Sequence, residues 1–82
     1  MALKSTDTCL AKVKADEPIF TLRAQDVTAP ACVEDWASSV IMEYHHARKV
    51  MPDSARQKVQ GAIETAHQMR AWQKANGSKL PD

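Results

Sequence analysis

Apolar residues recur every three or four positions through two long stretches of the chain, which is the spacing of one helix face. The first stretch alternates steps of four and three through Val33, Ala37, Val40, Tyr44, Ala47 and Met51. The second has similar spacing, at Ala55, Val59, Ala62, Ile63, Ala66, Met69 and Trp72. The pattern predicts helices over about residues 29–50 and about residues 54–76, each with an apolar seam. Trp36 and Ile41 widen the first seam.

Several residues suit the start of the first predicted helix. Thr28 has a side-chain oxygen that can accept hydrogen bonds from free N–H groups, and Pro30 fits the first turn. Glu34 and Asp35 complement the positive end of the helix dipole. These residues predict a helix that begins near residue 29.

The two predicted helices are separated by Pro52-Asp53-Ser54, which breaks the first helix and caps the second. The second helix ends at Asn76-Gly77, where glycine suits a backbone with positive φ. Such a short connection makes the helices antiparallel. Small residues in the second helix let the backbones approach closely: Ala55, Gly61, Ala62 and Ala66.

The segment before the helices has a different pattern, because residues 18–25 alternate with a period of two. One face has Phe20, Leu22 and Ala24, and the other has Thr21, Arg23 and Gln25. The alternation predicts a strand over about residues 18–25, preceded by a flexible arm over residues 1–15. The expected fold of residues 16–82 is mainly α: an N-terminal extended strand followed by an antiparallel two-helix hairpin.

The size of the chain predicts self-association. It has 82 residues, enough for one domain. A domain of this size buries only about 60% of the surface that its unfolded chain exposes. In addition, a single strand leaves its N–H and C=O groups unpaired. Both problems are solved if two copies associate about a two-fold axis, so we expect a homo-oligomer, at least a dimer, completed by pairing of the strand with its twin.

Composition narrows the classes of partner. The formal net charge is +1, which makes nucleic acid an unlikely partner. The sequence has neither a signal peptide nor a membrane-spanning apolar run, so we expect no membrane partner and a cytoplasmic location. Cys9 and Cys32 are too few for a disulfide scaffold.

Residues that could support catalysis or bind a metal are few. His45 and His46 are adjacent, so on a helix they point about 100° apart and cannot chelate one ion together. His67 and Cys32 have no acid at a spacing typical of a metal site or a catalytic dyad. We therefore predict no metal, no cofactor and no catalytic residues, and interpret these histidines as solvated or interface residues.

A polar cluster before the first helix suggests ligand binding instead, because helix N-termini attract anions and arginine binds phosphate or carboxylate with a planar fork. The two tryptophans could stack on a planar ligand. The predicted ligand-binding residues are Arg23, Gln25, Asp26, Trp36, Arg70 and Trp72. The alternative is structural: Arg23 and Asp26 brace the strand, and the tryptophans fill the core or an interface.

Four segments carry a resemblance to known proteins: EPIFTLRAQDVTAP, VEDWA, MRAWQ and KLPD. Over roughly residues 17–82 the chain resembles small uncharacterised phage and prophage proteins that combine a PIF-x-LRAQD motif with two helices. In architecture it is loosely similar to the anti-CBASS cyclic-nucleotide sponges of phages, which are short two-helix oligomers. Arg56 after the turn and Trp72 near the end of the second helix resemble those sponges, although the spacing differs.

The resemblance and the residues together favour a non-catalytic oligomeric binding protein. The leading hypothesis is a phage anti-defence factor that sequesters an anionic, nucleotide-type signalling ligand at subunit junctions. The alternative is an inhibitor or adaptor that binds a host protein through an exposed helix face. A DNA-binding regulator is disfavoured by the charge, and an enzyme is the least favoured class.

Overall fold

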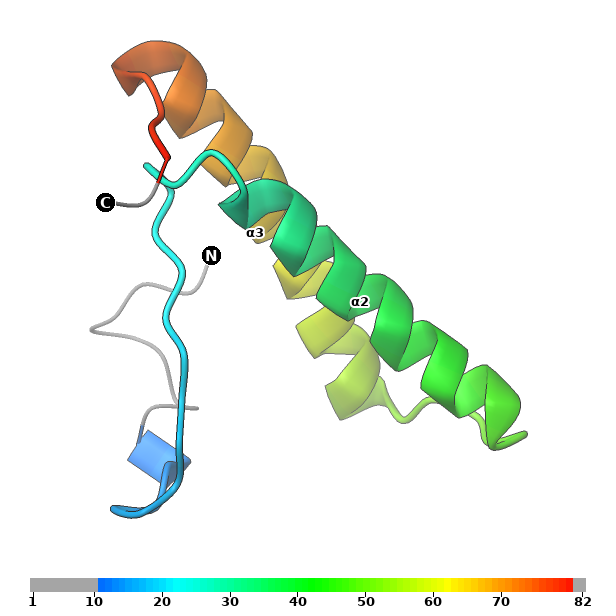
Figure 1. Ribbon diagram of the computed structural model, residues 1–82. Coiled ribbons are helices and arrows are strands. Elements are labelled where there is room, and N and C mark those ends of the chain that lie inside the picture. Colours follow the sequence, from blue (N-terminus) through cyan, green and yellow to red (C-terminus); the bar gives the residue numbers. More distant parts are fainter. Residues whose placement is uncertain (1–10, 81–82) are drawn as a thin grey trace.

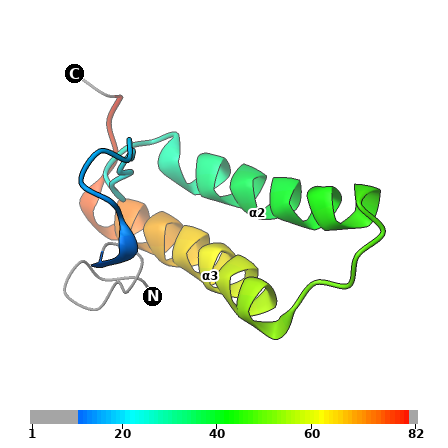
Figure 2. The ribbon, with the colours of Figure 1, turned by 90° about the horizontal axis from the view of Figure 1, so that it is seen from below.

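The computed structural model describes residues 11–80, which form two antiparallel helices and an extended N-terminal segment (Figures 1 and 2). Helix α2 spans Ala29–His46 and helix α3 spans Asp53–Asn76, with residues 47–52 between them. The predicted helical hairpin is therefore confirmed. No helix among residues 11–80 is long and apolar enough to cross a membrane.

The two helices pack along the predicted seams. In α2 the seam residues that are buried or half-buried are Pro30, Val33, Ala37, Val40 and Tyr44. In α3 they are Ala55, Val59, Ala62, Ala66, Met69 and Gln73. In α3 two positions differ from the prediction, since Ile63 and Trp72 are exposed, and Gln73 completes the seam four residues after Met69. In the first stretch, Ala47 is exposed and, like Met51, lies beyond the end of α2.

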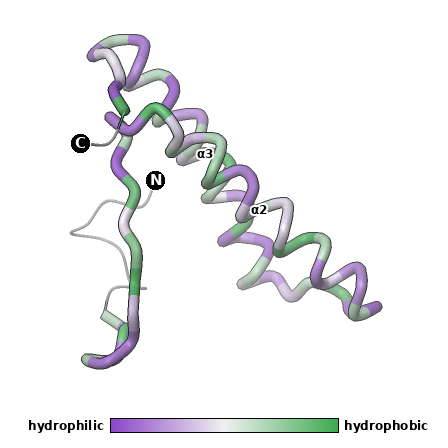
Figure 3. The backbone as a smooth tube through the Cα atoms, viewed as in Figure 1, coloured by the Kyte–Doolittle hydropathy of each residue, from purple (hydrophilic) through white to green (hydrophobic). Residues whose placement is uncertain are grey.

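The hairpin encloses very little apolar volume. The buried apolar residues of the described chain are Ala29, Pro30, Ala37, Val59 and Ala66, three of them alanines. Among residues 11–80 no bulky side chain is fully buried. Hydrophobic residues instead occur along both helices and along the extended segment (Figure 3), and many of the large ones face outward.

The strand predicted over residues 18–25 is not formed in the single chain. Residues 11–80 contain no strand, only one parallel bridge between Asp26 and Lys79. Residues 17–23 are extended, leave the hairpin at the end of α3 and run away from both helices (Figures 1 and 2). An extended segment becomes a strand only when the backbone N–H and C=O groups of a neighbouring segment form hydrogen bonds with its own. Residues 17–23 have no such neighbour within the described chain. The predicted arm, residues 1–15, lies mostly outside the described residues.

The start of α2 is organised by Asp26 rather than by the predicted cap. Thr28 has helical backbone angles (φ −87°, ψ −11°), and its side chain caps no N–H group. A capping side chain usually needs an extended backbone, so the prediction for Thr28 was wrong. The Asp26 carboxylate instead accepts hydrogen bonds from the Thr28 N–H (2.9 Å) and hydroxyl (2.8 Å). Pro30 does lie in the first turn, whereas that turn contains no acidic residue.

Helix α2 ends four residues earlier than predicted, in a Schellman motif. Lys49 N–H donates to the Tyr44 carbonyl (3.1 Å), and Arg48 N–H donates to the His45 carbonyl (3.0 Å). Arg48 has φ 54°, the left-handed conformation that this motif requires. The apolar pattern in the sequence continues to Met51, but it does not indicate that the backbone leaves the right-handed helical conformation at Arg48.

Arg48 therefore holds a conformation that favours glycine, which gives a first prediction. The left-handed region costs a residue with a Cβ about 1–2 kcal/mol. Arg48→Gly should raise the melting temperature by roughly 4–8 °C for each 1 kcal/mol recovered. Arg48→Ala is the matched control, because it removes the same charge and keeps the Cβ. An equal rise in both variants would assign the gain to charge and contradict this account of the motif.

Helix α3 begins at Asp53 after Pro52, and no side chain caps its N-terminus. The predicted helix break is confirmed, but the predicted cap is not formed. Arg56 braces the turn instead, with its guanidinium 3.4 Å from the Asp53 carboxylate and 3.3 Å from the Met51 carbonyl oxygen. At the other end Gly77 has the expected positive φ, 86°, with ψ 168°.

Candidate functional site

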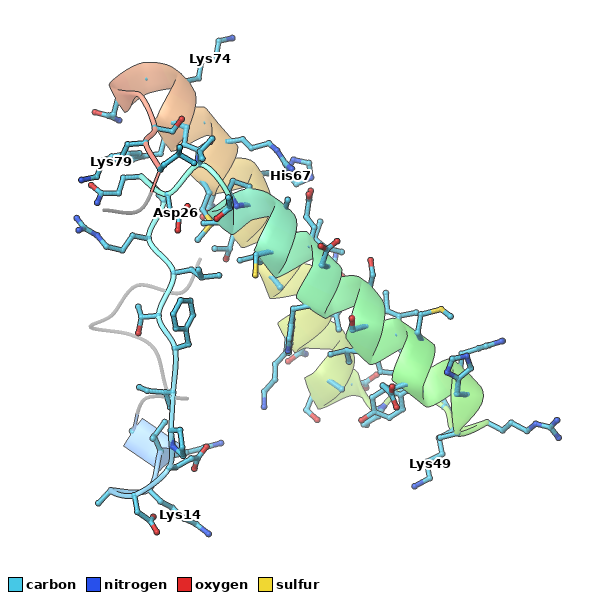
Figure 4. The ribbon with its side chains drawn as sticks, in the orientation of Figure 1. Lys14, Asp26, Lys49, His67, Lys74 and Lys79 are labelled. Carbon is cyan, nitrogen blue, oxygen red and sulfur yellow. The ribbon has the colours of Figure 1, made fainter. Side chains whose placement is uncertain are left out.

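The root of the extended segment, by which we mean residues 24–27 where it joins the hairpin, is hydrogen-bonded to α3 and to the C-terminal residues. The Gln73 side-chain amide donates to the carbonyl oxygens of Ala24 and Asp26, each at 2.9 Å. Lys79 N–H donates to the Gln25 carbonyl (2.9 Å), and Val27 N–H donates to the Lys79 carbonyl (3.0 Å). Asp26 and Lys79 therefore meet beside the end of α3 (Figure 4).

The Asp26 side chain has a structural role at this root. The hydrogen bond from the Thr28 N–H, followed by the one from its hydroxyl, lowers the pKa of the Asp26 carboxyl. Because the pKa is lowered, the contribution of these bonds to the stability of the fold is fully present above the ordinary pKa of 3.8. That contribution is lost as the pH falls through the lowered pKa. Asp26 thus stabilises the entry to α2, as in the structural alternative.

Two of the predicted ligand residues do meet. Gln25 and Trp72 line an open hollow of about 210 Å³ at the end of α3. The remaining lining residues are Asn76, Gly77, Ser78 and Lys79. Ligand pockets usually have volumes of roughly 300–1,000 Å³, so this hollow is smaller than a typical nucleotide site.

Arg70 does not lie beside Trp72. Its guanidinium donates two hydrogen bonds to the Glu34 carboxylate, at 2.6 and 2.7 Å, and so joins α3 to α2. Residues two apart on a helix point to nearly opposite sides, so Arg70 and Trp72 face different directions. The hydrogen bond lowers the pKa of Glu34 and raises the pKa of Arg70. Glu34 was predicted to complement the helix dipole, but its carboxylate instead forms this bidentate ion pair with Arg70.

The other two predicted ligand residues remain apart from the hollow. Trp36 is 49% exposed on α2, and it does not line the hollow. Arg23 is exposed, and its side chain makes no hydrogen bond or ion pair within residues 11–80. The six predicted residues therefore do not form one site in a single chain.

The histidines and Cys32 are also dispersed. The rings of His45 and His46 are tilted, with centroids 6.1 Å apart, and His67 projects from α3 (Figure 4). Cys32 is exposed, and Cys9 lies outside the described residues. Across residues 11–80 no three His, Cys, Asp or Glu side chains come together as metal ligands do.

An apolar pair that the sequence reasoning missed lies on the same edge as the Glu34–Arg70 contact. Ile41 is seven residues after Glu34, and Ile63 is seven residues before Arg70. A step of seven residues along a helix returns to nearly the same face. Because α2 and α3 are antiparallel, seven residues forward in α2 and seven residues back in α3 reach the same height, so Ile41 and Ile63 lie opposite each other across the hairpin. Both are substantially exposed, at 45% and 39%. The seven-residue offsets would have indicated the pair once the helix register was known.

A second missed feature is the extended segment itself. Phe20 is 86% exposed, and Ile19 beside it is also exposed. Within the described chain, the backbone of residues 18–22 makes no hydrogen bond.

Comparison with protein families, with curated proteins and with solved structures finds no match for this chain.

Proposed function

We propose that this chain is a small binding protein that works by association, first of all with copies of itself. The observation that carries the proposal is the distribution of apolar side chains. The buried ones are mostly alanines, whereas the large ones are exposed: Ile19, Phe20, Val27, Trp36, Ile41, Met42, Val50, Ile63, Trp72 and Leu80. A contiguous apolar surface on a soluble protein commonly marks an interaction site.

The energetic argument is that the hairpin lacks a sufficient core of its own. Burying one large apolar side chain stabilises a protein by roughly 1.5–3 kcal/mol, and an alanine contributes much less. A domain whose buried apolar residues are mainly alanines therefore gains little burial free energy to offset the conformational entropy that it loses on folding. Association of copies would bury Phe20, Ile41 and Ile63 and would supply the missing apolar burial.

Association also gives the extended segment a ladder partner, so the strand predicted over residues 18–25 forms in the oligomer in this proposal, as far as Arg23. An exposed peptide edge is a template for pairing with another chain. Residues 18–22 combine an open backbone edge with apolar side chains, and the residues that follow them are held by Gln73 and Lys79.

The proposal predicts that thermal stability depends on protein concentration. Because association stabilises the folded state by mass action, the melting temperature should rise by several degrees between about 1 and 100 μM chain. A melting temperature independent of concentration would contradict self-association. The same exposed side chains would then be assigned to a different protein partner, through the exposed helix face considered above.

Capture of an anionic, nucleotide-type ligand is a second candidate, favoured by the hollow that brings Gln25 and Trp72 together. Trp72 is 44% exposed, so one face of its ring can accept a base. A junction between subunits would enlarge the hollow to the volume that a nucleotide needs. In a phage setting, this activity would sequester a signalling nucleotide and so counter host defence.

Thermal shift with cyclic di-AMP and cyclic di-GMP tests the second candidate. Stacking on an aromatic ring contributes about 1–3 kcal/mol per base, so Trp72→Ala should weaken binding roughly tenfold or more. Trp36→Ala is the matched control, since Trp36 lies outside the hollow and should retain the shift. Absence of any shift in the unsubstituted protein would exclude these ligands, and an equal loss in both variants would place the site elsewhere.

A further inference from the structure

We infer that two copies pair through residues 17–23 as an antiparallel ribbon, with Phe20 opposite the partner's Phe20. The inference rests on the proposed self-association and names its interface and register. In this register each residue number and its partner's number add up to 40, so Glu17 faces the partner's Arg23 and Pro18 faces the partner's Leu22.

The length of the pairing follows from the hydrogen bonds already made. The backbone of residues 18–22 has no hydrogen bond within the described chain. Beyond Arg23, the carbonyl groups of Ala24 and Gln25 accept hydrogen bonds from Gln73 and Lys79. Before Glu17, the chain turns, with Glu17 N–H donating to the Lys14 carbonyl (3.1 Å). The Arg23 carbonyl is also engaged, because it accepts from Asp26 N–H (3.0 Å). The backbone open to a partner is therefore residues 18–22, centred on Phe20, and Glu17 and Arg23 flank it with exposed side chains.

The charges at the ends of this segment are self-complementary. Glu17 is at one end and Arg23 at the other, and antiparallel pairing centred on Phe20 places them opposite each other twice. A pairing centred one residue later, on Thr21, would place Arg23 opposite Ile19 and Glu17 opposite Gln25, whose carbonyl is already engaged. Only the pairing centred on Phe20 uses the whole open segment and matches both charges.

The proline also fits this register. If the two Phe20 residues form a non-hydrogen-bonded pair, Pro18 and the partner's Leu22 form another, because such pairs recur every second residue. Pro18 has no N–H, and at a non-hydrogen-bonded position none is needed. Ile19 and Thr21 then exchange the central hydrogen bonds. One face of the ribbon is apolar, with Pro18, Phe20 and Leu22.

This interface has a consequence for the anionic-ligand candidate. The two Arg23 residues are six residues apart along the ribbon, about 20 Å. Each lies beside a carboxylate of the other chain. A site that needs two guanidinium groups at the two-fold axis therefore does not form, and an anion would have to bind at the Trp72 hollow.

Charge reversal tests the register directly. Glu17→Arg gives a segment with arginine at both ends, and Arg23→Glu gives one with glutamate at both ends, so each variant should self-associate at least about tenfold more weakly. When the two variants are mixed, every facing pair is again opposite in charge. We expect a heterodimer with an affinity within a few-fold of the unsubstituted homodimer, detected by native mass spectrometry.

Glu64→Arg and Lys58→Glu are the controls, because they make the same charge changes at exposed positions of α3. Far-UV circular dichroism should show intact helices in all variants, since residues 17 and 23 are exposed and lie outside the hairpin. Variants that dimerise as well as the unsubstituted protein, or a mixture that fails to restore association, would overturn this register and leave the proposed self-association standing. A monomeric unsubstituted protein would overturn both.

Discussion

Gly77→Ala is expected to destabilise the protein by about 1–3 kcal/mol, because φ 86° with ψ 168° belongs to a region that is essentially restricted to glycine. Gly77 ends α3 and turns the chain so that Lys79 can pair with Gln25 and Val27. An added Cβ would meet no neighbouring atom within 4 Å, so the cost comes from the backbone alone. At one fixed protein concentration, the melting temperature should fall by roughly 4–8 °C for each 1 kcal/mol.

Gly61→Ala is the matched control and should have the opposite sign. Gly61 lies within α3, and a Cβ there also meets nothing within 4 Å. Alanine is favoured over glycine inside a helix by about 0.5–1 kcal/mol, so this variant should be more stable. The open space also corrects the prediction that Gly61 lets the two helices approach closely. Destabilisation of both variants would indicate that the two glycines are constrained in some other way.

Ala66→Leu should cost about 1–3 kcal/mol, since Ala66 is 0% exposed in the seam between α3 and α2. The added carbon atoms have to displace the facing helix or take an unfavourable rotamer. Alanine and leucine have similar helix propensities, so the change isolates packing. Differential scanning calorimetry should show a lower melting temperature.

Ala71→Leu, at an exposed position of the same helix, is the control and should change stability by less than about 0.5 kcal/mol. If Ala66→Leu left the melting temperature unchanged, the seam would have room for larger side chains. The close approach of the two helices would then be contradicted.

The helices were predictable because their signal is repeated. Ala37, Val40 and Tyr44 in α2 and Val59, Ala62 and Ala66 in α3 follow one period, and a single misplaced residue does not alter it. The ends were less predictable. Arg48 adopts the left-handed conformation with no glycine to indicate it, and α2 stops at His46, five residues before the apolar pattern ends at Met51.

The extended segment could be recognised but not assigned. Alternation over residues 18–25 indicated extended backbone correctly as far as Arg23, but a strand also needs a neighbour, and no neighbour can be read from the segment itself. Ala24 and Gln25 were included because they continue the alternation. Their carbonyls instead bond to Gln73 and Lys79, which are far away in the sequence.

The candidate site was the least predictable part. Arg70 and Trp72 were both predicted to bind ligand, but residues two apart on a helix point away from each other, and Arg70 pairs with Glu34. Gln25 and Trp72 meet only because Gly77 turns the C-terminal residues back over the end of α3. Local sequence contains no signal for a contact of this kind.

Sedimentation equilibrium of the full chain at 1–100 μM tests the central claim, self-association, most directly. Because the molar mass it reports does not depend on molecular shape, the extended segment does not distort the result. We expect a molar mass at least twice the 9.1 kDa of one chain, with dissociation at the lowest concentrations. A molar mass of 9.1 kDa throughout this range would contradict the account.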